Sequence, residues 1–397
     1  MNSRVLIAGV GMVPFTRPSA GASYDEMGAA AAEAALDDAG LSYDQVGQVY
    51  AGYVYGDSTA GQRVVYQLGM TRVPVLNVNN NCASGSSALW LARQAVASGV
   101  TECALAVGFE QMPPGALTTK WNDRPPPLLA FKSALEDIYA VDPALPMTPQ
   151  YFAAAAQEYL DSTDATAETL AAVSVKARSH AGRNPLAVFR DPITLDDVLS
   201  SPTVAGVLTR LQCCPPTSGA AATVVCTEEF ARKHGLDPRV AIAAQALESD
   251  DDDLFDARSA IALVGTGVTQ RTAERVYAEA GVDPADLDVV ELHDCFTINE
   301  VLTYEGLGLC EPGGAAKFIA EGDNTYGGRV VTNPSGGLLS KGHPLGATGL
   351  AQIAEITWQL RGTAGARQVP DARLGLQHNL GLGTAGVVTI LERLSAR

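Results

Sequence analysis

Two patterns of apolar and polar residues follow one another repeatedly along the chain. Short apolar runs bounded by turn residues, such as VLIAGVG at 5–11 and ECALAVGFE at 102–110, predict buried strands. Alanine-rich stretches such as MGAAAAEAALDDAG at 27–40 predict helices that stop at a glycine. Strands that alternate with helices indicate an α/β fold with mostly parallel sheets covered on both faces.

The order of strand, helix, turn and strand occurs twice, which predicts two related halves. The first copy continues from the helix at 27–40 through the turn LSYDQ to the strand VGQVYAGYV. The second copy begins near residue 260 with the predicted strand AIALVGTG, the helix TAERVYAEAG, the turn VDPADLD and the strand VVELHDC. Further along, a strand leads into Cys82 and a helix, and NPSGGLLSKGHPLGATG leads into the helix LAQIAEITWQL. If the halves are pseudo-symmetric, Cys82 and His343 occupy equivalent helix starts.

The pattern breaks between the halves into proline-rich turns and amphipathic helices, a segment too long for a simple connection. We therefore predict an inserted loop or lid domain. The predicted units are an N-terminal half at 1–112 and 212–258, the loop domain at 113–211, and a C-terminal half at 259–397.

The loop domain holds the densest positive charge of the chain, at Lys176, Arg178, His180, Arg183 and Arg190. Two interpretations stay open for these residues. They form either a solvated helix face or the pocket for a phosphorylated ligand.

Size and charge limit the classes of function. The chain has 397 residues with 47% hydrophobic and 18% charged content, enough for two packed cores, and a net charge of -17 that disfavours nucleic acid and anionic membranes as partners. No apolar run approaches the ~18 residues of a membrane span. Seven cysteines occur without a C-x-x-C pair or a secretion signal, so we expect reduced thiols in a cytoplasmic protein. Neither GVGMVPF nor GLGTAG spells the dinucleotide fingerprint, which disfavours a nicotinamide cofactor.

Cys82 and His343 are the first candidates for chemistry. Cys82 lies in NNNCASGSS between a strand and a helix, and a helix N-terminus favours a thiolate and can hold an oxyanion. Its position alone fits a buried packing residue equally well. His343 lies in KGHPLGATG at the other helix start, where the helix dipole lowers the pKa of the imidazole and leaves it neutral, able to accept a proton from a thiol. The alternative is a histidine that caps the turn.

His293 and Cys295 lie in ELHDCFTINE at the end of a predicted strand. Because side chains alternate along a strand, we expect these two on one face, with Asp294 on the other face holding the loop. A core strand end with a satisfied histidine is the alternative. Two histidines and two cysteines could bind zinc, but His-x-Cys lacks the usual spacing of ligand pairs, so we predict no metal site. Cys213 and Cys214 are interpreted as packing residues on a loop before a strand.

Seven motifs in this order resemble the thiolases, most of all the nonspecific lipid-transfer type represented by the thiolase domain of sterol carrier protein X. The motifs are NVNNNCASGSSALWLARQ, GFEQM, LQCCPPTSGAA, ELHDCFTINE, GDNTYGG, NPSGGLLSKGHPLGATGLAQ and QHNLGLG. The resemblance implies a thiolase fold, with two pseudo-symmetric halves that form a five-layered α/β/α/β/α core under an inserted loop domain.

The resemblance also implies roles for four residues. Cys82 matches the nucleophile, His343 the histidine that activates it, and His293 the position where other thiolases hold an oxyanion-hole asparagine. Cys295 matches the acid/base cysteine of this branch. Ordinary thiolases take that cysteine from a C-x-G motif near the C-terminus, where this chain reads HNLGLG.

The implied activity is cleavage of a 3-oxoacyl-CoA by CoA through an acyl-Cys82 intermediate, which gives acetyl-CoA or propionyl-CoA and a shortened acyl-CoA, or the reverse Claisen condensation. CoA is then a substrate, and no cofactor is expected. Gly381 or Gly383 would supply an oxyanion-hole N–H, and Lys176, Arg178 and Arg183 would bind CoA. A homodimer or homotetramer is the expected assembly.

Three alternatives stay open. The first is a retro-aldolase that acts on steroid or acyl-CoA side chains together with an OB-fold partner protein. The second is a ketosynthase-type condensing enzyme, and the third is a non-catalytic acyl-CoA or lipid-binding protein. Acyl labelling of Cys82 would separate the thiolase from the retro-aldolase, and CoA-dependent turnover would exclude a binding protein.

Overall fold

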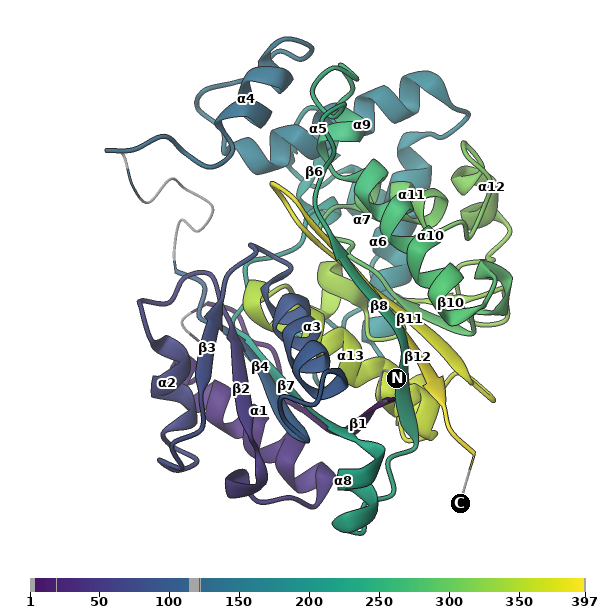
Figure 1. The fold of residues 1–397 in the computed structure, drawn as a ribbon. Helices are drawn as coiled ribbons and strands as arrows, with labels where there is room; N and C mark the ends of the chain where they lie inside the picture. Colours follow the sequence, from purple (N-terminus) through teal and green to yellow (C-terminus); the bar gives the residue numbers. More distant parts are fainter. Residues whose placement is uncertain (1–3, 19, 114–120, 122, 396–397) are drawn as a thin grey trace.

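A ten-stranded mixed sheet organises the protein in the computed structural model, which describes residues 4–18, 20–113, 121 and 123–395 (Figure 1). In chain order its strands are β1 (Val5–Met12), β2 (Gln48–Gly52), β3 (Val75–Val78), β4 (Cys103–Glu110), β7 (Gly219–Thr227), β8 (Val240–Glu248), β9 (Val289–Glu291), β10 (Val331–Thr332), β11 (Leu374–Gly381) and β12 (Ala385–Arg393). Across the sheet the order is β10-β9-β11-β12-β8-β1-β7-β4-β2-β3. A separate hairpin joins β5 (Thr203–Ala205) and β6 (Leu208–Thr209).

The strand order is symmetric about the contact between β1 and β8. Outward from this contact one half reads β1-β7-β4-β2-β3 and the other reads β8-β12-β11-β9-β10. The helices correspond as well, because α1 (Tyr24–Ala39) joins β1 to β2 as α10 (Thr266–Ala280) joins β8 to β9. Likewise α3 (Ser84–Ala97) follows β3 as α13 (Leu345–Arg361) follows β10. The predicted duplication is confirmed, and Cys82 and His343 precede equivalent helices.

Helices α3 and α13 pack against each other between the two halves of the sheet, and Figure 1 shows them at the centre of the molecule. Helix α13 contacts β4 and β7 of one half and β11 of the other. On the outer faces α1 covers β1 and β7, and α10 covers β8 and β12. This arrangement gives the five layers that the resemblance implies.

Two predictions about the strands are wrong. The sheet is not mostly parallel: only the pairs β2–β3, β2–β4, β9–β10 and β9–β11 are parallel, since β7 and β12 return beside β4 and β11 in the opposite direction. The run AIALVGTG is not a strand either, because it forms α9 (Ala260–Leu263) and the start of α10. The first strand of the second half is β8, which pairs with β12 along its length and with β1 at two positions. The C-terminal half therefore begins before the predicted boundary at residue 259.

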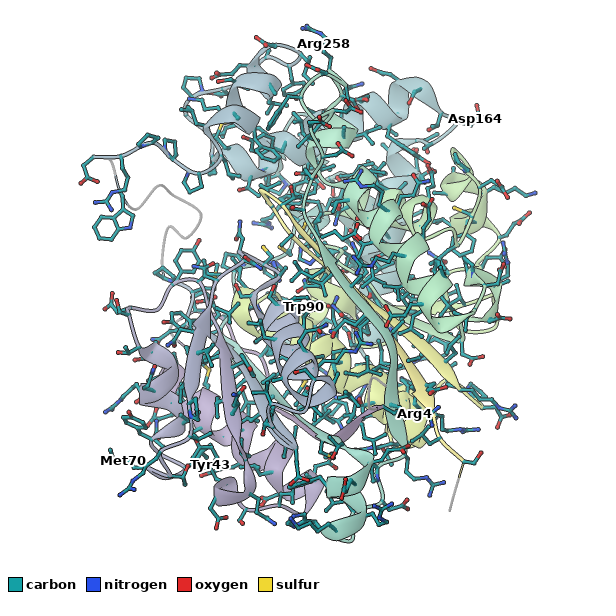
Figure 2. The ribbon with its side chains drawn as sticks, viewed as in Figure 1. Arg4, Tyr43, Met70, Trp90, Asp164 and Arg258 are labelled. Atoms are coloured by element: carbon teal, nitrogen blue, oxygen red, sulfur yellow. The ribbon has the colours of Figure 1, made fainter. Side chains whose placement is uncertain are left out.

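The remaining helices cover the sheet and build the inserted domain. They are α2 (Ala60–Val65), α4 (Leu129–Glu136), α5 (Met147–Ser162), α6 (Ala167–Ala181), α7 (Leu195–Leu199), α8 (Glu228–Lys233), α11 (Thr297–Gly306) and α12 (Ala315–Ala320). Figure 2 shows Asp164 of the insertion and Arg258 at the same end of the molecule, and Arg258 donates to the Asp137 carbonyl. The segment after β8 thus joins the inserted domain. Residues 114–120 and 122 of that predicted domain lie outside the described residues.

Across the described residues, the search for a helix with the length and apolarity needed to cross a bilayer finds none.

Candidate active site

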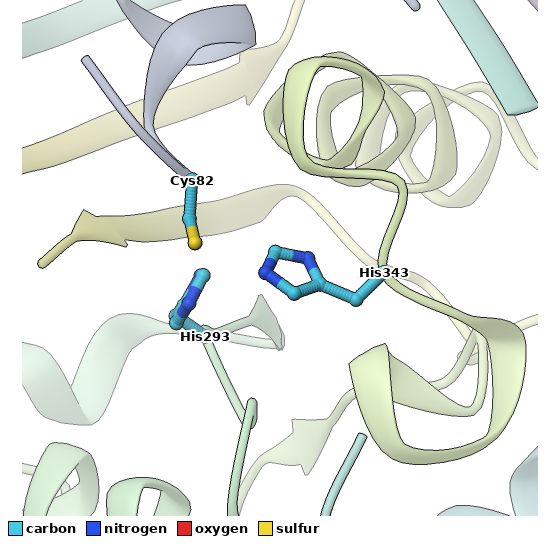
Figure 3. A group of neighbouring side chains, drawn as sticks. All are labelled: Cys82, His293 and His343. Carbon is cyan, nitrogen blue, oxygen red and sulfur yellow. The ribbon is translucent and has the colours of Figure 1, made fainter. Parts of the chain in front are cut away.

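A cavity of about 680 Å³ brings together three segments that are far apart in the sequence. The loop between β3 and α3 supplies Cys82, the loop after β9 supplies His293, and the turn before α13 supplies His343. One potential ligand atom from each side chain, the sulfur or a ring nitrogen, lies within 4.8 Å of the other two. Figure 3 shows the sulfur of Cys82 directed toward the two imidazole rings.

Cys82 is held by a tight turn before α3. Asn81 adopts a left-handed backbone with φ 51°, and its side-chain amide donates to the Leu382 carbonyl at 3.1 Å. The Ser84 hydroxyl accepts from the Asn80 N–H at 3.0 Å and closes the turn. Burial raises the pKa of Cys82 to about 12, and the nearby Glu110 carboxyl adds to this shift. This shift favours the protonated thiol in the resting protein, opposite in direction to the thiolate expected at a helix start.

His343 presents a bare ring nitrogen to the cavity. Its Nδ1 lies 2.7 Å from the Thr348 hydroxyl, which donates its own hydrogen to the Pro344 carbonyl at 3.0 Å. The hydroxyl therefore accepts from Nδ1–H, so Nε2 carries no hydrogen. This Nε2 is buried and has no hydrogen-bond partner among the described residues. Burial, followed by the charge of Lys341, lowers the pKa of His343 to about 3, so the ring is neutral as predicted, although burial rather than the helix dipole is the main cause.

His293 lies against His343, with ring centroids 5.0 Å apart and an interplanar angle of 85°. Its Nδ1 is 2.8 Å from the Asn379 side-chain amide nitrogen. Burial, followed by the charges of His343 and His378, holds the pKa of His293 well below its usual value. The strand β9 ends at Glu291, so strand alternation does not orient His293 and Cys295. Both nevertheless line the same cavity from the loop.

Cys295 is buried in the cavity wall, and its neighbours include Cys214, a residue that the sequence predicts only to pack. Burial raises the pKa of the Cys295 thiol, and nearby Cys214 and Cys82 raise it further. The Cys214 N–H donates to the Cys295 carbonyl at 2.8 Å, and the Cys214 side chain lines the cavity. No motif spacing pointed to Cys214, because it reaches the site through tertiary contact with the loop after β9.

Asp294 holds the loop, as predicted. Its carboxylate accepts from the N–H groups of Leu338 and Leu339 at 2.7 and 3.4 Å, at the start of a π-helical turn (Gly337–Lys341) that ends two residues before His343. A Cβ at Gly337, where φ is 60°, would lie 2.1 Å from Asp294 Oδ2, so glycine is required there. Burial raises the pKa of Asp294 to about 8.

The glycines proposed for the oxyanion hole lie beside the Cys82 loop. Gly381 ends β11, so close to this loop that a Cβ would lie 2.2 Å from the Asn80 carbonyl oxygen. Gly381 and Gly383 line a neighbouring cavity of about 980 Å³, while Leu382 between them borders both cavities.

The predicted CoA-binding residues are only partly brought to the cavity. Arg178 lines it, and its guanidinium lies 5.3 Å from the centroid of the Phe189 ring. Arg183 does not line it and instead stacks over the Tyr326 ring at 4.2 Å. Lys176 is a buried ion-pair partner of Glu300, which leaves its ammonium no route to a ligand in the cavity. The prediction that Lys176 binds CoA is therefore corrected, and the sequence gives no sign of the ion pair because the partner is 124 positions away.

Two arginines that the sequence does not single out also line the cavity. Arg17 lies 5.0 Å from the centroid of the Phe189 ring, on which Arg178 also packs. Arg210 comes from the short helical turn before Cys213. Both are isolated in the sequence and give no local signal.

Cys82, His293 and His343 also form the one group among the described residues whose ligand atoms lie close enough for a metal ion. Structural zinc sites use four protein ligands, and Cys295 is not part of this group. The expected absence of a metal stays a prediction.

Comparisons with known proteins agree along nearly the whole chain. The family model described as "Thiolase, N-terminal domain" matches residues 5–229, and "Thiolase C-terminal domain-like" matches residues 255–393. Sterol carrier protein 2 from Gallus gallus is 49% identical over 98% of this chain and 72% of that protein. Benzoylsuccinyl-CoA thiolase subunit BbsB from Thauera aromatica is 38% identical over 96% of each chain. The solved structure of an Ltp2–ChsH2(DUF35) aldolase is similar with a TM-score of 0.81 and 28% identity, over 98% of each chain.

Proposed function

We propose that this chain, which belongs to the thiolase family, cleaves 3-oxoacyl-CoA with CoA through an acyl-Cys82 intermediate, or runs the reverse Claisen condensation. One observation carries the proposal. A thiol and a neutral imidazole with a bare Nε2 lie together at a cavity large enough for a thioester. A base beside a nucleophile is the arrangement that covalent acyl transfer requires.

In the first half-reaction His343 Nε2 takes the proton of the Cys82 thiol as the sulfur attacks the C3 carbonyl carbon. The carbon–sulfur bond forms, and the carbonyl electrons move to the oxygen. Collapse of this adduct breaks the bond between C2 and C3 and expels the enolate of acetyl-CoA, or of propionyl-CoA from a 2-methyl substrate. Cys295 then protonates the enolate carbon and becomes a thiolate.

Two oxyanions need hydrogen-bond donors during these steps. For the tetrahedral adduct we propose the Cys82 N–H and a glycine N–H at Gly381 or Gly383, which the contact between Gly381 and the Cys82 loop supports. For the enolate oxygen we propose His293 together with His343, which is protonated at that stage. Each donor of this kind contributes roughly 10²–10³ in turnover.

In the second half-reaction the Cys295 thiolate accepts the proton of the CoA thiol, and the CoA sulfur attacks the acyl-Cys82 thioester. Cys82 leaves as a thiolate and recovers its proton from His343. All three groups return to their starting protonation states, so the cycle balances. Release of the first product before CoA reacts makes the kinetics ping-pong.

CoA carries phosphates, and the cavity wall offers guanidinium groups to bind them. Arg178, Arg17 and Arg210 line the cavity and have no carboxylate partner among the ion pairs of the described residues. Arg178 therefore stays our proposal for CoA recognition, and Arg17 and Arg210 join it. Homodimer or homotetramer formation stays a prediction.

A second candidate is a retro-aldolase, favoured by the similarity to the Ltp2–ChsH2(DUF35) aldolase. This reaction breaks a carbon–carbon bond without an acyl-enzyme and would involve a partner protein with an OB-fold. It gives no role to a second buried thiol such as Cys295 beside Cys82. The thiolase proposal uses both thiols, which is why we favour it.

Steady-state thiolysis with a panel of 3-oxoacyl-CoAs tests the proposal. Cys82→Ala should abolish CoA-dependent loss of the substrate, while Cys310→Ala, at a half-buried cysteine that does not line the cavity, should retain it. Wild-type turnover in Cys82→Ala would disprove the role of the thiol. Carbon–carbon cleavage without CoA, dependent on an added OB-fold protein, would favour the retro-aldolase.

A further inference from the structure

We propose that a chain of buried hydrogen bonds fixes which ring nitrogen of His293 carries its proton, and that Asn379 is the positioning residue at the end of this chain. The importance of this proton for catalysis rests on the proposed function, in which His293 donates to the enolate oxygen. The direction of the chain does not rest on it, because it follows from the hydrogen bonds alone.

The hydrogen-bond chain starts at a group that can only accept a hydrogen bond. The His378 carbonyl oxygen accepts from Gln352 Nε2 at 3.1 Å, which turns the other end of that amide, Oε1, toward Gln377. Gln377 Nε2 donates to this oxygen at 3.0 Å and to the Ser86 hydroxyl at 2.9 Å. Two consecutive amides are thereby oriented by one backbone carbonyl.

The donor-to-acceptor direction of these hydrogen bonds is then set through Ser86 as far as His293. Because the Ser86 hydroxyl accepts from Gln377, its own hydrogen is free to donate, and it does so to Asn379 Oδ1 at 2.9 Å. The amide nitrogen of Asn379 therefore faces His293, with Nδ2 at 2.8 Å from the ring Nδ1. An amide nitrogen can only donate, so Nδ1 of His293 must be the acceptor. The single proton of the neutral ring lies on Nε2.

A second branch of hydrogen bonds agrees with this orientation. The Thr389 hydroxyl donates to Gln377 Oε1 at 2.9 Å, since it already accepts from Gln245 Nε2 at 3.0 Å. With Gln245 Nε2 facing Thr389, the Gln377 oxygen also faces Thr389, as it does in the first branch. The two branches converge on one orientation for Gln377 and so for everything downstream.

Burial makes any other orientation of these side chains unfavourable. Ser86, Gln352, Gln377 and Asn379 have no exposed surface, and His293 is 1% exposed. Reversing one amide would leave buried donors facing donors, which is unfavourable because each donor loses its acceptor. The depressed pKa of His293 keeps the ring neutral, so only one nitrogen carries hydrogen.

The two histidines of the site are thus set in opposite tautomers. His343 holds its proton on Nδ1, toward Thr348, and presents a bare Nε2. His293 holds its proton on Nε2 and accepts at Nδ1. One ring is prepared to take the proton of Cys82, and the other is prepared to donate to an oxyanion before any substrate binds.

The hydrogen-bond chain also explains why the last residue of the GATG motif is a glycine. A Cβ at Gly349 of α13 would lie 2.0 Å from Ser86 Oγ and 2.8 Å from Asn379 Oδ1. Helix α13 passes so close to the Ser86–Asn379 hydrogen bond that no side chain fits between them. The glycine is required to keep the connection between the two halves intact.

Nitrogen-15 NMR of the resting protein tests the proposal directly, because it shows which ring nitrogen of a histidine carries hydrogen. The protein has five histidines, so single His→Gln variants can assign their ring signals. The wild type should show His293 protonated at Nε2 and His343 protonated at Nδ1. In Asn379→Asp the carboxylate can only accept, so the proton of His293 should move to Nδ1. The kcat for thiolysis should then fall by about 10²–10³-fold, the effect of one lost oxyanion donor, with KM for CoA unchanged.

Ser86→Ala and Thr389→Val provide a second variant and a control. Ser86→Ala frees the Asn379 amide, so His293 should populate both tautomers and kcat should fall by a smaller factor. Thr389→Val removes both hydrogen bonds of the side branch but leaves the first branch intact, so it should leave the His293 signal and kcat as in the wild type.

A wild-type His293 protonated at Nδ1 would overturn the proposal. So would an Asn379→Asp protein in which Nδ1 of His293 stays without hydrogen, or one in which the proton moves from Nε2 to Nδ1 while kcat stays at the wild-type value. If the tautomers are as stated but the wild type has no thiolysis activity, the proposed function fails and the hydrogen-bond chain stands.

Discussion

Removal of His343 gives a quantitative test of the proposed base. Burial raises the pKa of Cys82 to about 12, so at pH 8 only about one thiol in 10⁴ is ionised. In His343→Ala the attack must use this preformed thiolate, because the bare Nε2 is gone. Acylation at pH 8 should therefore slow by about 10⁴-fold, or about 5.5 kcal/mol, at the upper end of what general-base catalysis contributes.

The same substitution should change the pH dependence of acylation, measured by rapid quench with a 3-oxoacyl-CoA between pH 7 and 9. The rate in His343→Ala should rise about tenfold for each pH unit, since the thiolate fraction does so far below the pKa. The wild-type rate should change little, because the pKa of His343 is about 3 and the ring stays neutral throughout. His234→Ala, at a ring that stacks on Phe230 outside the cavity, is the matched control and should behave as the wild type. A flat pH profile in His343→Ala, or a rate within tenfold of the wild type, would show that His343 is not the base for Cys82.

Three other substitutions test separate parts of the structure. Lys341→Met leaves the buried Glu291 carboxylate without its ion-pair partner, so the free energy of unfolding in urea should fall by about 3–5 kcal/mol. Arg178→Ala should raise KM for CoA with little change in kcat, whereas Arg258→Ala, at an exposed position that does not line the cavity, should change neither. Burial raises the pKa of Glu110 from 4.5 to about 7, so between these pH values the folded protein retains a proton that the unfolded chain releases. Stability should therefore fall by about 3 kcal/mol as pH rises through this window, and Glu110→Gln should remove that contribution.

Each of these predictions has a result that would contradict it. A Lys341→Met protein as stable as the wild type would mean that Glu291 is uncharged in the folded state, and the double variant with Glu291→Gln should recover much of any loss. An unchanged KM in Arg178→Ala would remove it from CoA recognition. For Glu110, parallel curves of stability against pH in the wild type and in Glu110→Gln would contradict the raised pKa.

The internal repeat made much of the fold predictable from the sequence. The repeat alone pairs Cys82 with His343, because each precedes the helix that follows the third strand of its own copy, and the strand order confirms that equivalence. The prediction of a strand at 260–267 is wrong, since apolar residues over eight positions fit a strand or a buried helical segment equally well. There Gly265, with φ 88°, starts α10 directly after the single turn of α9.

Residues that act through tertiary contacts could not be predicted. Glu110 accepts from Val54, Tyr55 and Gly346, and so joins a loop of one half to the start of α13 in the other. Asn379 reaches His293 across 86 positions. Neither contact can be recognised from a motif or a regular spacing in the sequence, because each is created by the packing of two halves that fold from separate segments.

The proposed function requires that Cys82 carries the acyl group. Mass spectrometry of the intact protein after incubation with straight-chain, 2-methyl and sterol-derived 3-oxoacyl-CoAs measures it directly. One substrate class should add the mass of its shortened acyl group, peptide mapping should place it on Cys82, and added CoA should remove it. Carbon–carbon cleavage with no adduct on Cys82, or an adduct on Cys295 instead, would exclude Cys82 as the nucleophile.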